Sequence, residues 1–328
     1  MEKSLLYVQY AVLPKQGEDS FAVRSDGRGA MLCVADGCGG LGGKRYGQLG
    51  DHTGAYLASR LVTRAFTGWA EERKPMPDSP EDGRALCAEL EGDLRGILEG
   101  FARRNCQAGA PGRIVGSMQR VLPTTLCAAM VEGGSVMRRE CLFVWAGDSR
   151  GYVLDAGGLH QCTRDDTRGV PDPFESLYRD APLSNLLSAD QPPRLSMRRV
   201  TAQTPCAVIC ATDGAFGCLP TPMEFEMLLL STMLAANTPE SWERRMQTAL
   251  RKLAHDDATI LCLLCGFQSF DEVKAHFALR RETLKNTLIT PVRRRRHDMA
   301  FKREKWREYE KSYDWTGGAQ HGQNDWRI

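Results

Sequence analysis

Acidic residues stand at the ends of five short apolar segments in this sequence. Three of these segments end in an aspartate, and two others begin directly after an acidic pair. The aspartates are Asp36, Asp148 and Asp213, and the pairs are Glu18-Asp19 and Asp256-Asp257. If strands that end in an acid run antiparallel to strands that begin with one, all of these carboxylates reach the same end of the sheets. A single aspartate after a strand is usually a turn former, but five such positions indicate one shared cluster.

The charge of such a cluster indicates its chemistry. Several carboxylates without interleaved Lys or Arg repel one another and raise their pKa values unless cations bind among them. Oxygen ligands without His or Cys favour Mg²⁺ or Mn²⁺ over zinc. Glycines beside Asp36 and Asp213 allow sharp turns, so a backbone carbonyl such as that of Gly37 could also face a metal. Two such ions can lower the pKa of a shared water and direct it at phosphorus.

The apolar segments that must position these acids have the length and composition of β-strands. They are bounded by Gly, Asp or Pro and lie at residues 21–26, 30–36, 124–132, 140–148, 151–156, 206–213 and 258–267. Amphipathic patterns predict helices at about residues 46–66, 81–104, 223–236 and 240–254. This order predicts an α+β fold in which helix pairs cover antiparallel sheets.

The composition is that of an ordinary globular protein. Of the 328 residues, 42% are hydrophobic, 26% charged and 8% aromatic, which excludes the disordered, collagenous and fibrous classes. The sequence has no apolar run of about 18 residues and no N-terminal targeting pattern, so a cytoplasmic protein without membrane contact is expected. The 12 cysteines are scattered through apolar segments, which predicts reduced thiols. Cys262 and Cys265 lack a second ligand pair, so packing is favoured over zinc binding.

The net charge of +2 is divided unevenly along the chain. Residues 1–279 carry 30 Lys+Arg against 34 Asp+Glu, whereas residues 280–328 carry 13 against 7. Such a basic tail is usually a solvated charged helix, although it can also contact an acidic partner. The segment at residues 163–205 is rich in Pro, Asp and Ser and is predicted to be a loop.

The C-terminal part has two helical patterns separated by an arginine run. The first helix is expected at about residues 271–288 and the run lies at residues 293–296. In the charged segment that follows, Trp306, Tyr309 and Tyr313 share one helical stripe. The favoured interpretation is a helix docked on the body through Trp306 and Tyr309, and a regulatory protein partner is the alternative, ahead of nucleic acid. The last ~12 residues are expected to be disordered.

Six short motifs follow one another along the chain in a fixed order. They are Gly17-Glu18-Asp19-Ser20, Asp36-Gly37-Cys38-Gly39-Gly40, Thr124-Thr125-Leu126, Gly147-Asp148-Ser149-Arg150, Ala211-Thr212-Asp213-Gly214 and Asp256-Asp257-Ala258-Thr259. Over residues 7–266 this ordered set resembles the metal-dependent protein phosphatases of type 2C (the PPM family). The resemblance implies a phosphatase domain at residues 1–268 and a basic helical extension at residues 269–328. It also implies a central antiparallel β-sandwich flanked by helix pairs, in four layers (α-β-β-α).

The resemblance also assigns ligands for two Mg²⁺ or Mn²⁺ ions. Asp36 would bridge the two ions, and the catalytic residues would be Asp36, Asp213 and Asp256. Asp213 and Asp256 would hold one ion, while Glu18 and the carbonyl of Gly37 would hold the other.

Further acids match supporting positions of the family. Asp148, together with Asp213, matches a position linked to a weaker third ion. Asp19 and Asp257 would orient waters and metal ligands. The implied reaction is direct attack of an activated water on phosphoserine or phosphothreonine.

The sequence departs from the family where the substrate phosphate binds and at one turn. Pro14 stands where the family commonly has a phosphate-binding Arg, and only Lys15 beside it offers positive charge. A lysine is a point charge rather than a two-pronged donor, so weaker phosphate binding is expected. Cys38 replaces a His that eukaryotic members use as a general acid and that bacterial members often lack. This replacement indicates a bacterial-like member.

The favoured function is a signalling phosphatase that acts on phosphorylated proteins and opposes a Ser/Thr kinase. The retained carboxylates favour an active enzyme, whereas the missing Arg favours a weakly active pseudophosphatase that binds phosphoproteins. A phosphatase of small phosphoesters is a third option, because a fold does not fix the substrate.

Overall fold

The computed structural model is built around two antiparallel sheets. It describes residues 4–26, 29–72, 76–106, 119–132, 137–169, 172–178, 181–315 and 326–328. The first sheet has five strands, in the order β1 (Leu5–Tyr10), β12 (Ala258–Cys265), β11 (Cys206–Ala211), β8 (Arg150–Asp155) and β9 (Gly158–Gln161). The second has six, in the order β13 (Trp326–Arg327), β10 (Ser196–Gln203), β7 (Arg138–Ala146), β6 (Leu126–Glu132), β3 (Gly29–Ala35) and β2 (Ser20–Asp26). The expected combination of antiparallel sheets and helices is therefore confirmed.

The two sheets pack against each other through alternate residues of their strands. In β3, Leu32 and Val34 join a buried cluster with Val208 of β11 and Leu261 of β12. Because successive side chains of a strand point to opposite faces, the residues between them belong to a different cluster. Met31 of β3 is one of these and packs toward helices. The strand segments are apolar on both faces because both faces are buried.

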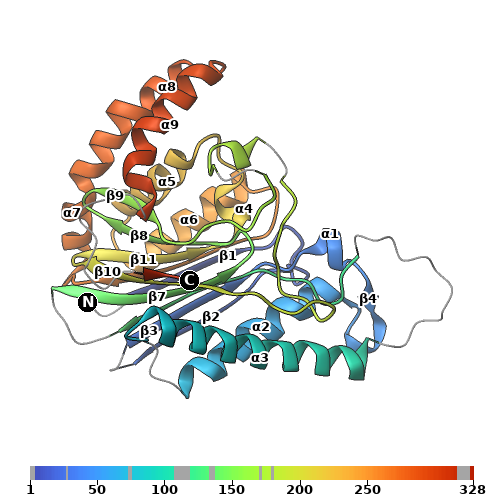
Figure 1. Ribbon diagram of the computed structural model, residues 1–328. Helices are drawn as coiled ribbons and strands as arrows, with labels where there is room; N and C mark the ends of the chain where they lie inside the picture. The colour runs from blue at the N-terminus through green and yellow to red at the C-terminus, as the bar shows by residue number, and fades with distance from the viewer. Residues whose placement is uncertain are drawn as a thin grey trace.

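Two long helices cover the outer face of the six-stranded sheet. They are α2 (Gly54–Glu71) and α3 (Pro80–Asn105), and Figure 1 shows them side by side along this sheet. Phe66 of α2 and Leu94 of α3 are fully buried in the cluster that contains Met31. The pattern at about residues 46–66 corresponds to α2, which starts later than predicted. The pattern at about residues 81–104 corresponds to α3, whose bounds agree within a residue.

A second group of helices covers the outer face of the five-stranded sheet. It consists of α4 (Asp213–Phe216), α5 (Pro222–Leu234), α6 (Pro239–Leu253), α7 (Phe270–Leu284), α8 (Thr290–Arg294) and α9 (Met299–Tyr313), with a π-helical turn at Lys285–Ile289 between α7 and α8. The capping box of Thr238 and Ser241 begins α6. Nine of the 13 residues of α5 are buried and none is exposed. The reason is that α5 packs against α6, α7 and α9, and its Phe225 contacts Tyr152 of the sheet.

The C-terminal helices share the core of the five-stranded sheet. Trp306, Tyr309 and Tyr313 of α9 are buried in one cluster with Tyr152 of β8 and Phe225 of α5. The predicted aromatic stripe is therefore the buried face of α9, and its rings are covered by this chain itself. In Figure 1, α7, α8 and α9 rise together from the body at the upper left. The predicted domain boundary at residues 268 and 269 falls between β12 and α7 and remains a prediction.

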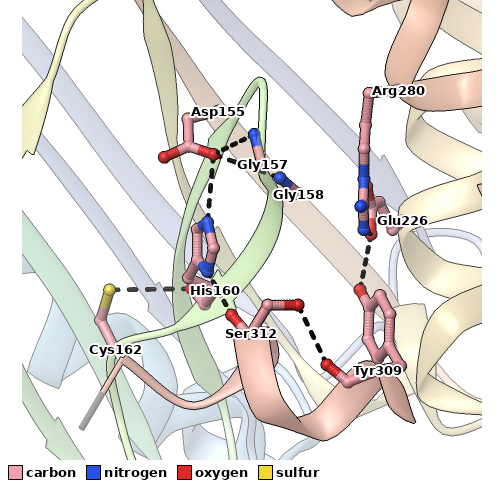
Figure 2. A network of polar contacts seen from close by, with 9 residues as sticks. All are labelled: Asp155, Gly157, Gly158, His160, Cys162, Glu226, Arg280, Tyr309 and Ser312. Atoms are coloured by element: carbon pink, nitrogen blue, oxygen red, sulfur yellow. Dashed lines mark hydrogen bonds and ion pairs between the residues drawn. The ribbon is translucent and has the colours of Figure 1, made fainter. Parts of the chain in front are cut away.

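Two polar networks attach α9 to the body, and both are visible in Figure 2. Glu226 of α5, whose side chain is fully buried, accepts hydrogen bonds from Arg280 Nε (2.5 Å) and Nη2 (2.8 Å) of α7 and from the Tyr309 hydroxyl (2.7 Å). In the second network the His160 ring lies between the Asp155 carboxylate (3.1 Å) and the Ser312 carbonyl. A buried carboxylate that accepts three hydrogen bonds fixes how α5, α7 and α9 meet.

The His160 network predicts a pH-dependent contribution to stability. Burial opposes the charged ring, but the hydrogen bond and charge of Asp155, the Ser312 carbonyl and the charge of Glu226 together raise the pKa of His160. A raised folded-state pKa gives stability that is complete below the unfolded pKa and is lost as pH rises through the folded one. We expect His160→Gln to cost on the order of 1 kcal/mol more at about pH 6 than at about pH 9. Urea unfolding of wild type and variant at both pH values measures the difference.

The matched control for this prediction is His297→Gln, because His297 is exposed beyond the end of α8. Its effect should be smaller than that of His160→Gln at about pH 6. An equal cost of His160→Gln at both pH values would contradict the ionic role of His160.

Three sequence-based expectations about secondary structure are wrong in part. Residues 46–53 are not helical: β4 (Arg45–Tyr46) and β5 (His52–Thr53) form a small hairpin around a 3₁₀ turn at Gly47–Leu49, and α2 begins only at Gly54. Gly50 and Asp51 have φ angles of 79° and 57°, which end any helix before this point. The loop predicted at residues 163–205 contains β10, which was missed because Arg198 and Arg199 interrupt its apolar pattern. Of the residues expected to be disordered, Trp326 and Arg327 pair with β10, and residues 316–325 lie outside the described part.

The cysteines behave as the sequence suggests. All 12 are free thiols, and most are buried in the sheets. Cys262 and Cys265 are both buried on β12, which agrees with packing rather than zinc binding. Among the helices of the described residues, none has the length and apolar character needed to cross a membrane.

Candidate active site

Three aspartates from the two sheets meet at one end of the structure. Asp36 follows β3, Asp148 follows β7, and Asp213 begins α4 directly after β11. One ligand oxygen of each lies within 4.8 Å of those of the other two. Among the residues that the structure describes, they form the one group of three His, Cys or carboxylate side chains arranged to hold a metal ion. The antiparallel arrangement predicted from the strand ends therefore brings these three acids together.

The protonation equilibria of this group show how strongly its charges interact. Burial and then the charge of Asp213 raise the pKa of both Asp36 and Asp148 well above the usual range. Burial and then the charge of Asp256 raise the pKa of Asp213 to about 6. Like charges held together out of water have this effect, and a bound cation would reverse it.

Two further predicted ligands and one predicted supporting acid line a pocket next to the three aspartates. Glu18, Asp256 and Asp257 are among the residues that line this pocket of about 290 Å³. The charge of Asp256 acts on both Asp36 and Asp213, so the pocket and the aspartate group form one electrostatic unit. Burial and the charges of Asp257 and Asp256 raise the pKa of Glu18, although a hydrogen bond from Thr53 opposes the shift.

Asp257 and Asp19 tie the strands together behind the pocket. The Asp257 carboxylate accepts hydrogen bonds from the backbone N–H of Glu18 (2.6 Å) and of Val12 (2.8 Å). Asp19 Oδ2 accepts from the hydroxyls of Thr212 (2.8 Å) and Thr259 (2.7 Å). Burial is the main cause that raises the pKa of Asp19 to about 7, and its Oδ1 is buried without a protein partner. Such an oxygen is free to hold a water or a cation.

The residues fit a pair of hard divalent cations. The predicted ligands are carboxylate oxygens, with His and Cys absent from the group of three aspartates. Gly37 is buried against Glu18, since a Cβ built on it would lie 2.9 Å from the Glu18 carbonyl oxygen and 2.6 Å from that of Ala55. The donor set, the raised pKa values and the unpartnered Asp19 oxygen all agree with Mg²⁺ or Mn²⁺.

The predicted phosphate-binding residue lies outside the pocket, whereas the predicted turn residue lies among the acids. Lys15 is exposed in the turn after β1, with a φ angle of 66°, and is not among the residues that line the pocket. Cys38 begins the turn that leads to α1 (Gly39–Gly42). Burial and the charge of Asp36 raise the pKa of its thiol well above the usual value.

Glycine at position 39 makes room for the Glu18 carboxylate. A Cβ at Gly39 would lie 2.0 Å from Glu18 Oε2, whereas a Cβ at Gly40 would meet no atom within 4 Å. We expect Gly39→Ala to displace Glu18 and to weaken Mn²⁺ binding about 10–100-fold, as the loss of a supporting contact typically does. Titration calorimetry with Mn²⁺ measures the change.

The matched control is Gly40→Ala, which adds the same methyl group one residue later in α1. Its Mn²⁺ affinity and melting temperature should equal those of the wild type. Equal Mn²⁺ affinities of the two variants would show that Glu18 does not bind metal.

Sequence reasoning missed the residues that orient these acids. Thr53 donates a hydrogen bond to Glu18 Oε1, and Thr125 Oγ1 accepts one from the Asp36 N–H (3.0 Å). Arg150 forms a buried two-pronged ion pair with Asp165 (2.6–3.2 Å) and lies 4.2 Å above the Phe216 ring. Thr125 and Arg150 both stand in motifs quoted from the sequence, which was the available signal, whereas Asp165 lies in a loop whose sequence has no periodicity.

Two antiparallel sheets thus share a carboxylate cluster at one end, and sequence comparison identifies the family. The protein phosphatase 2C family model matches residues 14–254, so the chain belongs to this family. The chain is 27% identical over 241 residues to the serine/threonine protein phosphatase PstP of Mycobacterium tuberculosis, which covers 70% of this chain and 39% of PstP. It therefore spans about two fifths of that relative's length. It is also 27% identical over 263 residues to the protein phosphatase PTC7 homolog fig of Drosophila mojavensis, covering 80% of this chain and 71% of that protein.

Solved structures show the same fold. The serine/threonine phosphatase Stp1 from Staphylococcus aureus superposes with a TM-score of 0.56 at 16% identity, covering 79% of this chain and 94% of that chain. The catalytic domain of PstP, solved in complex with two manganese ions, superposes with a TM-score of 0.50 at 23% identity, covering 79% and 97%.

Proposed function

We propose that this chain is a metal-dependent protein serine/threonine phosphatase. The observation that carries the proposal is the meeting of Asp36, Asp148 and Asp213 from separate strands beside the pocket of Glu18 and Asp256. Membership of the family supports it, and so do the manganese ions of the PstP catalytic domain.

We assign the metal ligands as the sequence predicts. Asp36 would contact both ions, Asp213 and Asp256 would hold one, and Glu18 with the Gly37 carbonyl would hold the other. Asp148 is close enough to Asp36 and Asp213 to add a third site. The Mg²⁺ or Mn²⁺ ions, when bound, supply the positive charge that lowers the pKa of a water and neutralises the phosphoryl group.

The protein's own residues hold this site in place. Thr53 orients the Glu18 carboxylate, and Asp257 holds the Glu18 backbone at 2.6 Å. Asp19 links Thr212 and Thr259 and so fixes the approach of β11 to β12 beside Asp213. Ligands fixed before the substrate arrives lower the cost of binding and orientation.

The substrate class follows from the family. We infer phosphoserine and phosphothreonine in proteins as substrates, and a Ser/Thr kinase as the opposing enzyme. In this account the fold is a β-sandwich between two helix layers, and residues 269–328 are a basic helical extension to the phosphatase domain.

Release of phosphate from a phosphothreonine peptide tests the proposal. We expect turnover with Mn²⁺ or Mg²⁺ and none with EDTA, at rates well above those on small phosphoesters. Turnover of small phosphoesters alone would contradict a protein substrate and indicate a phosphatase of small phosphoesters. A folded, metal-bound protein without any turnover would contradict catalysis and indicate a phosphoprotein-binding role.

A further inference from the structure

The pocket beside the metal ligands needs a positive group if it is to bind a phosphate. Acids dominate its charged lining, and Pro14 stands where the resemblance calls for an arginine. Lys15 lies in an exposed turn outside the lining. A phosphate dianion binds most strongly to charged donors that can make two parallel hydrogen bonds.

Arg45 is placed to meet this need. It lies on β4 and lines the pocket together with Glu18 and Asp256. Of the residues described for this lining, Arg45 is the single Lys or Arg. Its charge acts on Glu18, where it opposes the burial that raises the Glu18 pKa. Arg45 is therefore close to a predicted metal ligand without being one.

The hairpin that carries Arg45 is firmly attached to the site. Thr53 at its far end caps α2 by accepting a hydrogen bond from the Tyr56 N–H (3.1 Å) and donates another to Glu18. His52 stacks on the Tyr56 ring at 3.7 Å, and the Arg60 guanidinium lies over the same ring at 3.4 Å. A group on such a hairpin is held in position before substrate binds.

The present contacts of Arg45 leave it able to bind an anion. Its Nη1 donates to the Asp51 carbonyl (2.6 Å), and its Nη2 donates to Gln16 Oε1 (3.3 Å). The Asp51 carboxylate is 3.5 Å away and 70% exposed, and the Arg45 side chain is 48% exposed. An ion pair with this exposure is weak, and an arginine has five N–H donors. Gln16 belongs to the turn that contains Lys15, so Arg45 also links that turn to the pocket.

We infer that Arg45 binds the phosphate of the substrate, in the role that the sequence assigned to Lys15. The inference rests on the proposed function for its substrate. The guanidinium would hold phosphate oxygens that point away from the metal ligands, and so orient the ester for attack. No proton is transferred by Arg45, because its guanidinium stays charged.

Two variants of Arg45, a comparison with Lys15→Ala and one control test the role of Arg45. Arg45→Ala removes the group, and Arg45→Lys keeps the charge without the two-pronged geometry. The control is Arg84→Ala, an exposed arginine of α3 paired with Glu81 at 3.3 Å. For each protein, kcat and KM are measured on a phosphothreonine peptide, and binding of inorganic phosphate to the Mn²⁺-loaded protein is measured by calorimetry.

We expect Arg45→Ala to lower kcat/KM and phosphate affinity about 10–100-fold, the range for one charged hydrogen-bonding group. Arg45→Lys should lie between Arg45→Ala and the wild type, and all three variants should keep the wild-type melting temperature and Mn²⁺ affinity. Unchanged phosphate affinity in Arg45→Ala would overturn the inference. So would a larger loss in Lys15→Ala than in Arg45→Ala.

The phosphate measurement keeps this inference separate from the proposed function. If the wild type binds phosphate but hydrolyses nothing, the proposed function fails, and loss of phosphate binding in Arg45→Ala still supports the inference. If the wild type is active and Arg45→Ala equals it in both assays, the inference fails alone. If Arg45→Ala lowers the melting temperature, the inference is tested with Arg45→Lys instead. Unchanged phosphate affinity together with unchanged kcat/KM in Arg45→Lys would then contradict the inference.

Discussion

Replacement of Asp36 by asparagine is expected to lower metal-dependent turnover of a phosphothreonine peptide by roughly a thousandfold or more. A carboxylate oxygen of Asp36 lies within 4.8 Å of a carboxylate oxygen of Asp148 and of Asp213. Asp36 is also the residue assigned as a ligand of both ions. Asparagine keeps the shape of the side chain but removes the charge that holds two cations together. The measurement is kcat with saturating Mn²⁺, alongside Mn²⁺ affinity by calorimetry.

The fold should survive this substitution. The backbone of Asp36 is held by the Thr125 side chain and by the Thr124 hydroxyl, which donates to the Asp36 carbonyl (2.7 Å). Removing one of several repelling carboxylates should also leave the melting temperature of the metal-free protein equal or higher. Asp271→Asn, an 89% exposed aspartate on α7, is the control and should be fully active. Full activity in Asp36→Asn would refute its assignment as a metal ligand.

The second prediction of a large effect concerns the stability of the fold. It involves the buried pair of Arg280 and Glu226, which is not part of the pocket. The fully buried Glu226 carboxylate accepts two hydrogen bonds from Arg280 and one from the Tyr309 hydroxyl. Arg280→Ala removes the first two and leaves the one from Tyr309. Breaking a buried ion pair from one side typically costs about 3–5 kcal/mol, because the other charge stays buried without compensation. We expect a loss of this size in the free energy of unfolding, measured with urea.

A double variant separates the cost of the stranded charge from the value of the pair. Arg280→Met with Glu226→Leu removes both charges, and replacing a buried pair with apolar groups is often neutral or stabilising. It should therefore recover most of the loss. Lys274→Ala, which breaks an exposed pair with Asp271 at 3.5 Å on the same helix, should cost less than about 1 kcal/mol. A cost of Arg280→Ala no larger than that of Lys274→Ala would contradict the network drawn in Figure 2.

The strand ends were predictable because burial on both faces leaves a clear pattern. β3 and β12 read as continuous apolar runs, and the acids beside them are the polar residues at their ends. Antiparallel pairing then places Ser20 opposite Ala35, so that Asp19 and Asp36 come to the same end of the sheet. This reasoning requires only the alternation of strands and turns.

Other parts of the site have no such pattern. The hairpin of β4 and β5 has two residues in each strand, too few for a period to be recognised, and its sequence was assigned to a helix. Its residues Arg45 and Thr53 become visible as site residues only in three dimensions. β10 contains Arg198 and Arg199, whose charges are compensated by the Cys162 carbonyl and by Glu140 from other elements. Long-range partners of this kind cannot be read from local sequence.

The C-terminal helix α9 has one feature that the sequence predicted and one that it did not. The aromatic stripe of α9 was predicted from its spacing, and the burial of Trp306 and Tyr309 agrees with docking on the body. These rings are therefore not available to a partner. Glu226 as the polar anchor of this region gave no signal, because it lies in α5 among apolar residues. Arg294, Arg295 and Arg296 are exposed, and an acidic partner for the basic tail stays a prediction.

The most direct test of the central claim is a crystal structure of the protein grown with Mn²⁺, with anomalous diffraction recorded at the manganese absorption edge. The account predicts two strong anomalous peaks that share Asp36 as a ligand, one also bound by Asp213 and Asp256 and the other by Glu18 and the Gly37 carbonyl. A well-ordered structure at saturating Mn²⁺ with no peak in contact with Asp36 would contradict it.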